Sequence, residues 1–240
     1  MALILRLTAA MLGAVALVGP VAAADLLTRP QAPPVRYQAQ VPASDTYVAV
    51  RGGAAWSQDA DWSFAGSAVS TSFDQPGYLY AAAIGLQLDR TLRETPGLRA
   101  EIEVGHKRSD TERHTSTLPA LAGKAAAGAV SATYAMASLY YDLFKSSLIT
   151  PFFGAGAGIS RVSAESVGVA GGPAITDDHG MSWIYHATAG VSVQLSPRWQ
   201  LEAAYRFMST PDVGLRDATG ASTELNARDH LVLGGVRANF

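Results

Sequence analysis

The chain has 240 residues, with 18 lysines and arginines against 20 aspartates and glutamates, and it has no cysteine. The absence of cysteine excludes a disulfide scaffold and a thiolate metal site, and the near-neutral charge implies no nucleic-acid partner. Charged residues make up 16% of the chain, below the roughly 25% of soluble domains, which favours a protein whose outer surface meets lipid.

Residues 1–24 have the pattern of a secretory signal peptide. Arg6 supplies the positive charge, an apolar stretch follows, and residues 22–24 are alanines suited to cleavage. The apolar stretch is shorter than the roughly 20 residues of a membrane-spanning helix, which argues against an anchor. Residues 25–46 are rich in proline and poor in apolar groups, so we expect an extended periplasmic lead-in there.

The remainder, residues 47–240, resolves into eight segments in which apolar residues alternate with polar or small ones. Each is close to the roughly 9 to 11 residues of a tilted membrane strand. The segments cover residues 47–56, 78–89, 98–108, 130–142, 150–161, 183–195, 199–207 and 230–240. The pattern predicts an all-β fold, an eight-stranded antiparallel up-and-down transmembrane β-barrel.

Alternation alone does not decide which face of a strand points inward, because a soluble barrel with an apolar interior has the same period. The polar face of this chain is often small, as at Gly154, Gly156 and Gly158 in one segment and at Thr188 and Gly190 in the next. Small residues suit the crowded lumen of an eight-strand barrel. We therefore expect the polar face inward and the apolar face against lipid.

The connections between the segments alternate in length. Three are short, at 90–97, 143–149 and 196–198, whereas the other four, at 57–77, 109–129, 162–182 and 208–229, are much longer. Short periplasmic turns and long extracellular loops are typical of outer-membrane barrels. Aromatic residues gather near both ends of the segments, as they do at the two interfaces of a membrane.

Charged side chains recur at inward positions, most densely in the segment 98–108. The inward charged residues are Arg51, Arg99, Glu101, Glu103, Lys107, Glu202, Arg206 and Arg237. Unpaired charges are very costly in a narrow lumen, so we expect a network of ion pairs across the barrel. Two roles stay open for it: a plug that fixes the packing of the barrel, or a gate for small ions.

Other polar residues give weaker signals. His186, Thr188 and Glu202 face inward on neighbouring segments, as a catalytic triad or as a satisfied polar cluster. The glycines at 154, 156 and 158 recur within a strand rather than in a turn before a helix, which indicates relief of crowding instead of phosphate binding. The run 177–179, Asp-Asp-His, is expected in an outer loop, as a solvated stretch rather than as a site for a divalent cation. We predict no catalytic, cofactor-binding or metal-binding residues.

Four stretches together carry a family resemblance: Ala24 to Leu26 before the proline-rich lead, Thr150 to Gly158, Leu201 to Phe207, and His230 to Phe240. In their order and spacing the chain resembles the small outer-membrane β-barrel proteins of alphaproteobacteria. These form the Omp25/Omp31 and opacity-related surface antigen group within the OmpA-like eight-strand barrels.

The resemblance implies a monomer in the cell outer membrane, surrounded by outer-membrane lipid and lipopolysaccharide, that stabilises the envelope and displays loops outside. It also implies insertion by the outer-membrane assembly machinery. The insertion signal corresponds to Val236, Ala238 and Phe240, where alanine at 238 replaces a frequent aromatic. No cofactor is implied.

Three functions are therefore considered. A structural surface protein is expected first, a narrow porin-like channel or small-ligand-binding barrel second, and a lipid A-modifying enzyme third. The family of outer-membrane lipid A deacylases carries a His-x-Ser motif that acts toward the membrane, whereas His186 and Thr188 form a His-x-Thr motif that faces the lumen.

Overall fold

The computed structural model describes residues 45–58, 60–64, 67–72, 76–88, 97–110, 113–116, 126–144, 148–169, 174–216 and 222–240. The predicted signal peptide, and the predicted lead-in up to residue 44, lie outside the described residues. No helix within these ranges is long and apolar enough to cross a membrane.

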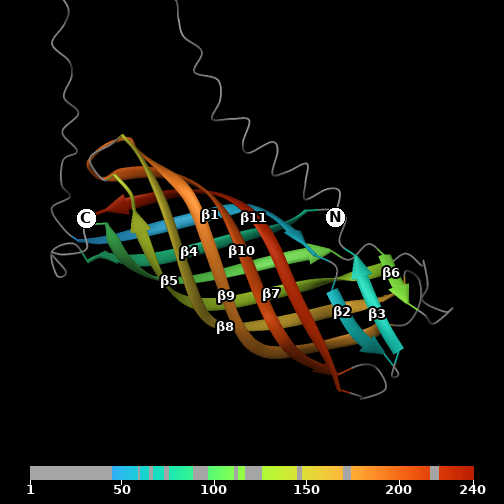
Figure 1. The fold of residues 1–240 in the computed structure, drawn as a ribbon. Helices are drawn as coiled ribbons and strands as arrows, with labels where there is room; N and C mark the ends of the chain where they lie inside the picture. The colour runs from blue at the N-terminus through green and yellow to red at the C-terminus, as the bar shows by residue number, and fades with distance from the viewer. Residues whose placement is uncertain are drawn as a thin grey trace, which may run out of the picture. The chain divides into compact units, whose positions relative to one another are not determined.

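Eight strands form a closed β-barrel in which all neighbours are antiparallel (Figure 1). Each strand pairs with the barrel strands before and after it in the chain, and the first and last strands pair to close the ring. The barrel strands are β1 (Thr46–Ser57), β4 (Gly77–Gln87), β5 (Leu98–Asp110), β7 (Ala126–Asp142), β8 (Ile149–Val169), β9 (Ala174–Gln194), β10 (Trp199–Arg216) and β11 (Ser222–Asn239). The predicted eight-stranded up-and-down barrel is confirmed.

Strands β1 and β11 close the barrel along the full length of β1. Their register runs from Tyr47 opposite Asn239 to Ser57 opposite Asp229. A closed ring leaves no unpaired strand edge, and unpaired backbone groups are not tolerated in contact with lipid.

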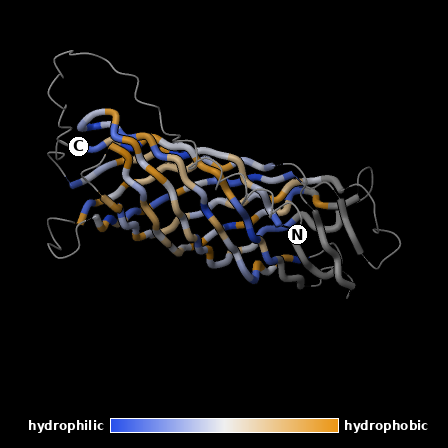
Figure 2. Tube along the Cα trace, turned by 45° about the horizontal axis from the view of Figure 1, so that its top comes forward, coloured by the Kyte–Doolittle hydropathy of each residue, from blue (hydrophilic) through white to orange (hydrophobic). Residues whose placement is uncertain are grey.

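The two faces of each strand differ as the sequence predicts. On the outward face, Ile84 and Ile102 are 58% and 61% exposed, whereas the inward Glu103 and Arg206 are each 1% exposed. Hydrophobic and hydrophilic residues alternate along the strands in Figure 2. The apolar face meets lipid and the charged face is enclosed, so the predicted orientation of the strands is confirmed.

Several strands continue farther on the extracellular side than predicted. Strand β8 extends to Val169 and β9 begins at Ala174, so most of the predicted loop 162–182 is a paired hairpin. Strands β7, β10 and β11 likewise include parts of the predicted loops 109–129 and 208–229. At 21 residues each, β8 and β9 exceed the roughly 9 to 11 residues that span a membrane. The prediction of unpaired loops in these stretches is wrong, because backbone pairing continues beyond the lipid.

A second, three-stranded sheet arises from the two connections that precede β4 and β7. It consists of β2 (Ala60–Phe64), β3 (Ser67–Ser72) and β6 (Arg113–Ser116), in the order β2-β3-β6 with antiparallel pairing. The sequence predicts only loops at these positions, so this sheet is a further correction.

The periplasmic turns are short, and one of them sets the start of β5. Gly97 has a φ of +102°, which glycine adopts without steric cost. Its carbonyl accepts a hydrogen bond of 2.9 Å from the backbone N–H of Asp142 at the end of β7. This contact fixes the neighbouring Arg99 at the periplasmic end of the lumen.

Candidate functional site

The lumen of the barrel holds the charged residues that the sequence places on inward faces. β1 contributes Arg51, β5 contributes Arg99, Glu101 and Glu103, and the last two strands contribute Glu202, Arg206 and Arg237. All seven are buried, with at most 9% of any residue exposed. The structure brings them together in one network, which we call the lumen network.

Arg51 is the centre of the lumen network. Its guanidinium donates to both carboxylate oxygens of Glu101, with the Nη2 to Oε2 distance at 2.9 Å. It also donates to Glu103 Oε2 at 2.8 Å and to Glu202 Oε2 at 3.0 Å. One cation from β1 thus contacts three carboxylates from two strands. Charge-assisted hydrogen bonds of this kind are shorter and stronger than neutral ones.

Arg206 forms a two-point pair with Glu103. Its Nη1 lies 2.5 Å from Glu103 Oε1, and its Nη2 lies 3.1 Å from Oε2. The Tyr134 hydroxyl donates to Glu103 Oε1 at 3.0 Å, while Arg206 Nε donates to Thr188 Oγ1 at 3.1 Å. Hydrogen bonds therefore satisfy both members of this buried ion pair, as burial of charge requires.

The periplasmic part of the lumen network holds the other two arginines. Arg99 Nε donates to Asp142 Oδ1 at 3.0 Å, and its guanidinium carbon lies 4.3 Å from the centre of the Tyr140 ring. Arg237 Nε lies 3.3 Å from Glu202 Oε1. Asp142 was not among the predicted site residues. It lies two residues after Tyr140 on β7 and therefore faces inward like Tyr140. Each of the four arginines has at least one carboxylate within 4 Å.

A second charged level of the lumen lies nearer the extracellular end, where Lys107 pairs with Asp229. Lys107 Nζ donates to Asp229, and the Ser57 hydroxyl donates to the same carboxylate at 2.6 Å. Lys107 stands at a predicted inward position. Asp229 falls one residue before the predicted start of the last strand, so it is absent from the predicted inward residues.

Between these two charged levels the lumen is apolar. On β11, for example, Leu231 and Leu233 lie between Asp229 and Arg237, and each is at most 2% exposed. We call this group the apolar layer; its members are Ala55, Leu79, Ala81, Tyr134, Met136, Ile184, Met208, Leu231 and Leu233. The sequence does not predict this layer directly, because a polar inward face is expected and these inward residues are mostly apolar. Leu231 and Leu233 alternate in step with the inward Arg237 on β11, so the period of two does place them inside.

His186 and Thr188 are held as a satisfied polar cluster. His186 Nδ1 lies 2.9 Å from Thr188 Oγ1, and Nε2 lies 2.8 Å from Ser138 Oγ. The carboxylate of Glu202 is engaged by Arg51 and by Arg237 instead. This geometry does not align a hydroxyl, an imidazole and a carboxylate in the order that nucleophilic catalysis needs.

The glycines of β8 make room for large inward side chains on its neighbours. A Cβ built on Gly154 would overlap the Tyr140 ring, and one on Gly156 would overlap Ser138 and His186. The interpretation of these glycines as relief from crowding is therefore confirmed.

The acidic run at 177–179 lies within β9, not in a loop, so that prediction is wrong. Asp178 Oδ2 accepts a hydrogen bond of 2.8 Å from the Arg216 N–H. Backbone hydrogen bonds from His179 and Arg216 lower the pKa of the Asp178 carboxyl. Where side chains are described, no group of three or more His, Asp or Glu residues is arranged to hold a metal ion.

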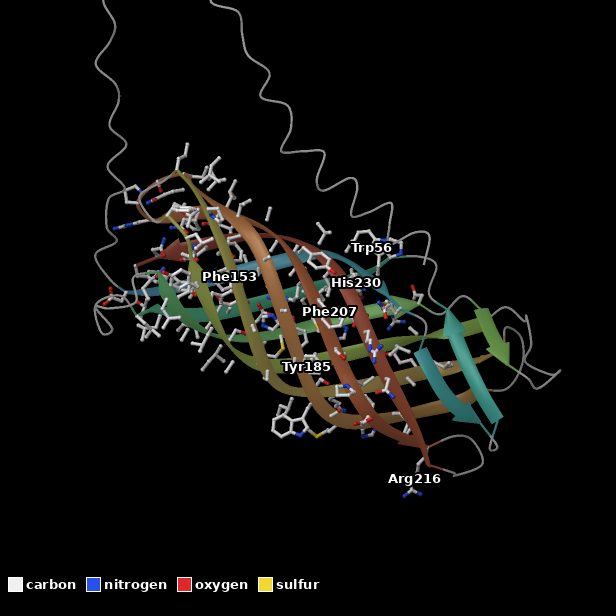
Figure 3. All side chains as sticks on the ribbon, viewed as in Figure 1. Trp56, Phe153, Tyr185, Phe207, Arg216 and His230 are labelled. Carbon is white, nitrogen blue, oxygen red and sulfur yellow. The ribbon has the colours of Figure 1, made fainter. Side chains whose placement is uncertain are left out.

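At the end of β11, the predicted insertion-signal residues lie on the outward face. Val236 is 36% exposed and Phe240 is 60% exposed, while Ala238 between them is partly exposed. Phe153 on β8 belongs to the same periplasmic end of the barrel (Figure 3).

Comparison with known proteins agrees with this architecture. The model of a family described as the outer membrane protein beta-barrel domain matches residues 14–240. No curated protein sequence matches the chain. Among solved structures, the outer membrane protein OprG from Pseudomonas aeruginosa is 11% identical, with a TM-score of 0.53 over 85% of this chain and 99% of that one.

Two further solved structures are similar over most of their length. Neisserial surface protein A is 21% identical, with a TM-score of 0.48 over 82% of this chain and 98% of that one. The N-terminal barrel domain of Pseudomonas aeruginosa OprF is 12% identical, with a TM-score of 0.40 over 82% and 98% of the two chains.

Proposed function

Because the chain belongs to the outer membrane protein β-barrel family, we propose that it is a structural barrel that supports envelope integrity and displays its extracellular hairpins to the surroundings. The protein is located in the outer membrane. We propose that it acts there as a monomer, in contact with outer-membrane lipid and lipopolysaccharide. The assembly machinery would recognise the outward face of β11 at Val236, Ala238 and Phe240.

The observation that carries the proposal is the set of buried contacts inside the lumen. The lumen network joins strands on opposite sides of the barrel, and the buried apolar layer lies next to it on the extracellular side. Ion pairs across a lumen resist its deformation, while a packed apolar level leaves no polar path for ions. A closed and cross-braced barrel is suited to a mechanical role in the membrane.

A strain that lacks the gene tests the structural role. We expect it to release more outer-membrane vesicles and to resist detergent less than the parent, and the wild-type gene should restore both properties. A deletion strain with unchanged vesicle release and unchanged detergent resistance would contradict the proposal.

A narrow porin-like channel is the second candidate, and one observation favours it. At the periplasmic side of the lumen network, Arg99 Nη2, Arg237 Nη1 and Asn239 Nδ2 are buried without a hydrogen-bond acceptor among the described residues. Buried donors normally bind water when the protein offers no acceptor. A hydrated periplasmic half would conduct ions only if the apolar layer opened, so electrical recordings separate the two candidates.

A further inference from the structure

The outward surface at the extracellular membrane boundary has an aromatic part over most strands and a polar part over three of them. In the aromatic part, the rings of Phe207 and His230 lie 5.5 Å apart, and Trp56 stands opposite His230 in the β1–β11 register (Figure 3). Tyr205 is hydrogen-bonded to His230 in the same group. This arrangement is typical of the aromatic belt of a membrane barrel.

Across β5, β7 and β8 the belt is interrupted. Tyr80 on β4 is followed in register by His106, then Thr133, then Arg161, on three successive strands. Among the described residues, the outward positions of these three strands at this level hold no Tyr, Trp or Phe. We call His106, Thr133 and Arg161 the polar gap.

The polar gap lies directly above a lipid-facing surface. Val104 on β5 and Ile159 on β8 are the next outward residues toward the membrane centre from His106 and Arg161. They are 55% and 49% exposed. Trp183 on the next strand is opposite Ile159 and 70% exposed. The gap is therefore at the depth where headgroups meet acyl chains.

The charge of the polar gap is not neutralised within the described part of the protein. The Arg161 side chain is exposed and forms no ion pair or hydrogen bond with a described residue. The neighbouring Arg108, by contrast, binds Glu165 at 2.6 Å and lies 3.5 Å from Asp110. The carboxylates nearby are thus engaged by Arg108, and the Arg161 guanidinium is available to a ligand.

The donors of the polar gap are arranged for a phosphate. Adjacent strands are roughly 4.8 Å apart, so the three side chains emerge within about 10 Å of one another. The His106 Nδ1 lies 3.0 Å from Thr133 Oγ1, which orients the imidazole beside the hydroxyl. A guanidinium fork with adjacent hydroxyl and imidazole groups matches the oxygen atoms of a phosphate.

We propose that the polar gap binds the phosphate group of a glycolipid in the outer leaflet, whose acyl chains lie on Val104, Ile159 and Trp183 below it. The inference deepens the proposed contact with lipopolysaccharide and rests on it, but it does not depend on whether the lumen is closed.

Binding of diphosphoryl lipid A to the detergent-purified protein, freed of native lipid and measured by native mass spectrometry, tests the proposal. We expect dephosphorylated lipid A to bind about tenfold more weakly, because a hydrogen bond to a charged group is lost. Arg161→Gln should lose about the same factor, and Arg161→Lys should lose less. Arg198→Gln removes an exposed arginine at the periplasmic end and should bind like the wild type.

Heat-modifiable migration on a denaturing gel shows that each variant is folded. The proposal is overturned if folded Arg161→Gln binds diphosphoryl lipid A as tightly as the wild type, or if the dephosphorylated lipid binds equally well. Displacement of lipid A by an equal concentration of inorganic phosphate would show a site for free anions and would overturn the lipid assignment.

Discussion

Glu103 on β5 and Arg206 on β10 form a two-point ion pair across the full width of the barrel lumen, with distances of 2.5 and 3.1 Å. In the ring of eight strands, β5 and β10 are four positions apart in either direction, so they stand on opposite walls. Strand pairing alone connects each strand only to its neighbours. The ion pair therefore adds a direct link between walls that the sheet itself does not join.

Removal of the charge at Glu103 should strongly destabilise the barrel. Glu103→Gln leaves Arg206 and Arg51 with one carboxylate fewer in a buried site, and loss of one partner of a buried pair costs about 3–5 kcal/mol. The free energy of unfolding by urea in lipid vesicles measures this effect. The double variant with Arg206→Gln should lose less than the sum of the two single variants. Additive losses would show that the two residues do not interact.

Two glycine substitutions distinguish a crowded lumen from an open one. Gly156→Ala places a methyl group against Ser138 and His186, and overpacking of this kind costs about 1–3 kcal/mol. Gly234→Ala is the matched control, because a Cβ there meets no atom within 4 Å. The fraction of heat-modifiable protein after refolding reports both. Equal yields for the two variants would be inconsistent with a packed lumen.

The outward orientation of Ile84 predicts a penalty that depends on lipid. An arginine on the lipid face near the bilayer centre costs about 2–4 kcal/mol, so Ile84→Arg should lower the free energy of unfolding in vesicles by this amount. Ile84→Phe should have little effect, because an apolar ring is accepted by lipid. If Ile84→Arg unfolds like the wild type, the side chain does not face the membrane interior.

The extracellular pair of Arg108 and Glu165 predicts a dependence on pH. The hydrogen bond from Arg108 holds the pKa of the Glu165 carboxyl below its ordinary value of 4.5. The pair is therefore fully formed above pH 4.5 and is lost as the pH falls through the lowered pKa. A carbon NMR titration should show the pKa of Glu165 rising toward 4.5 in Arg108→Gln. An unchanged titration would mean that another group causes the shift.

The membrane-spanning part of the fold could be predicted from the sequence because lipid imposes a strict alternation on each strand. Ile84 and Glu103 are assigned to opposite faces by parity alone. Beyond the membrane that constraint ends, so the outer parts of β8 and β9 do not show the apolar outward face that identifies a membrane strand: in β8, Val162 and Ala164 are buried and Glu165 is exposed. The small sheet of β2, β3 and β6 was missed for the same reason.

The composition of the lumen could be predicted only in part. Parity places Arg51 and Arg206 inside, but which carboxylate each contacts depends on the register between strands, which the sequence does not state. Asp229 lay just outside a predicted strand. The apolar layer was missed because Leu231 and Leu233 are hydrophobic at positions where a polar residue was expected.

Single-channel recording of the purified wild-type protein in planar bilayers tests the closed lumen most directly. We expect no steady current at any applied voltage, because buried ion pairs cross the lumen at one level and buried apolar side chains pack together at the next. A long-lived unitary current that becomes smaller in Leu231→Trp would contradict this and would show that ions pass through the apolar layer.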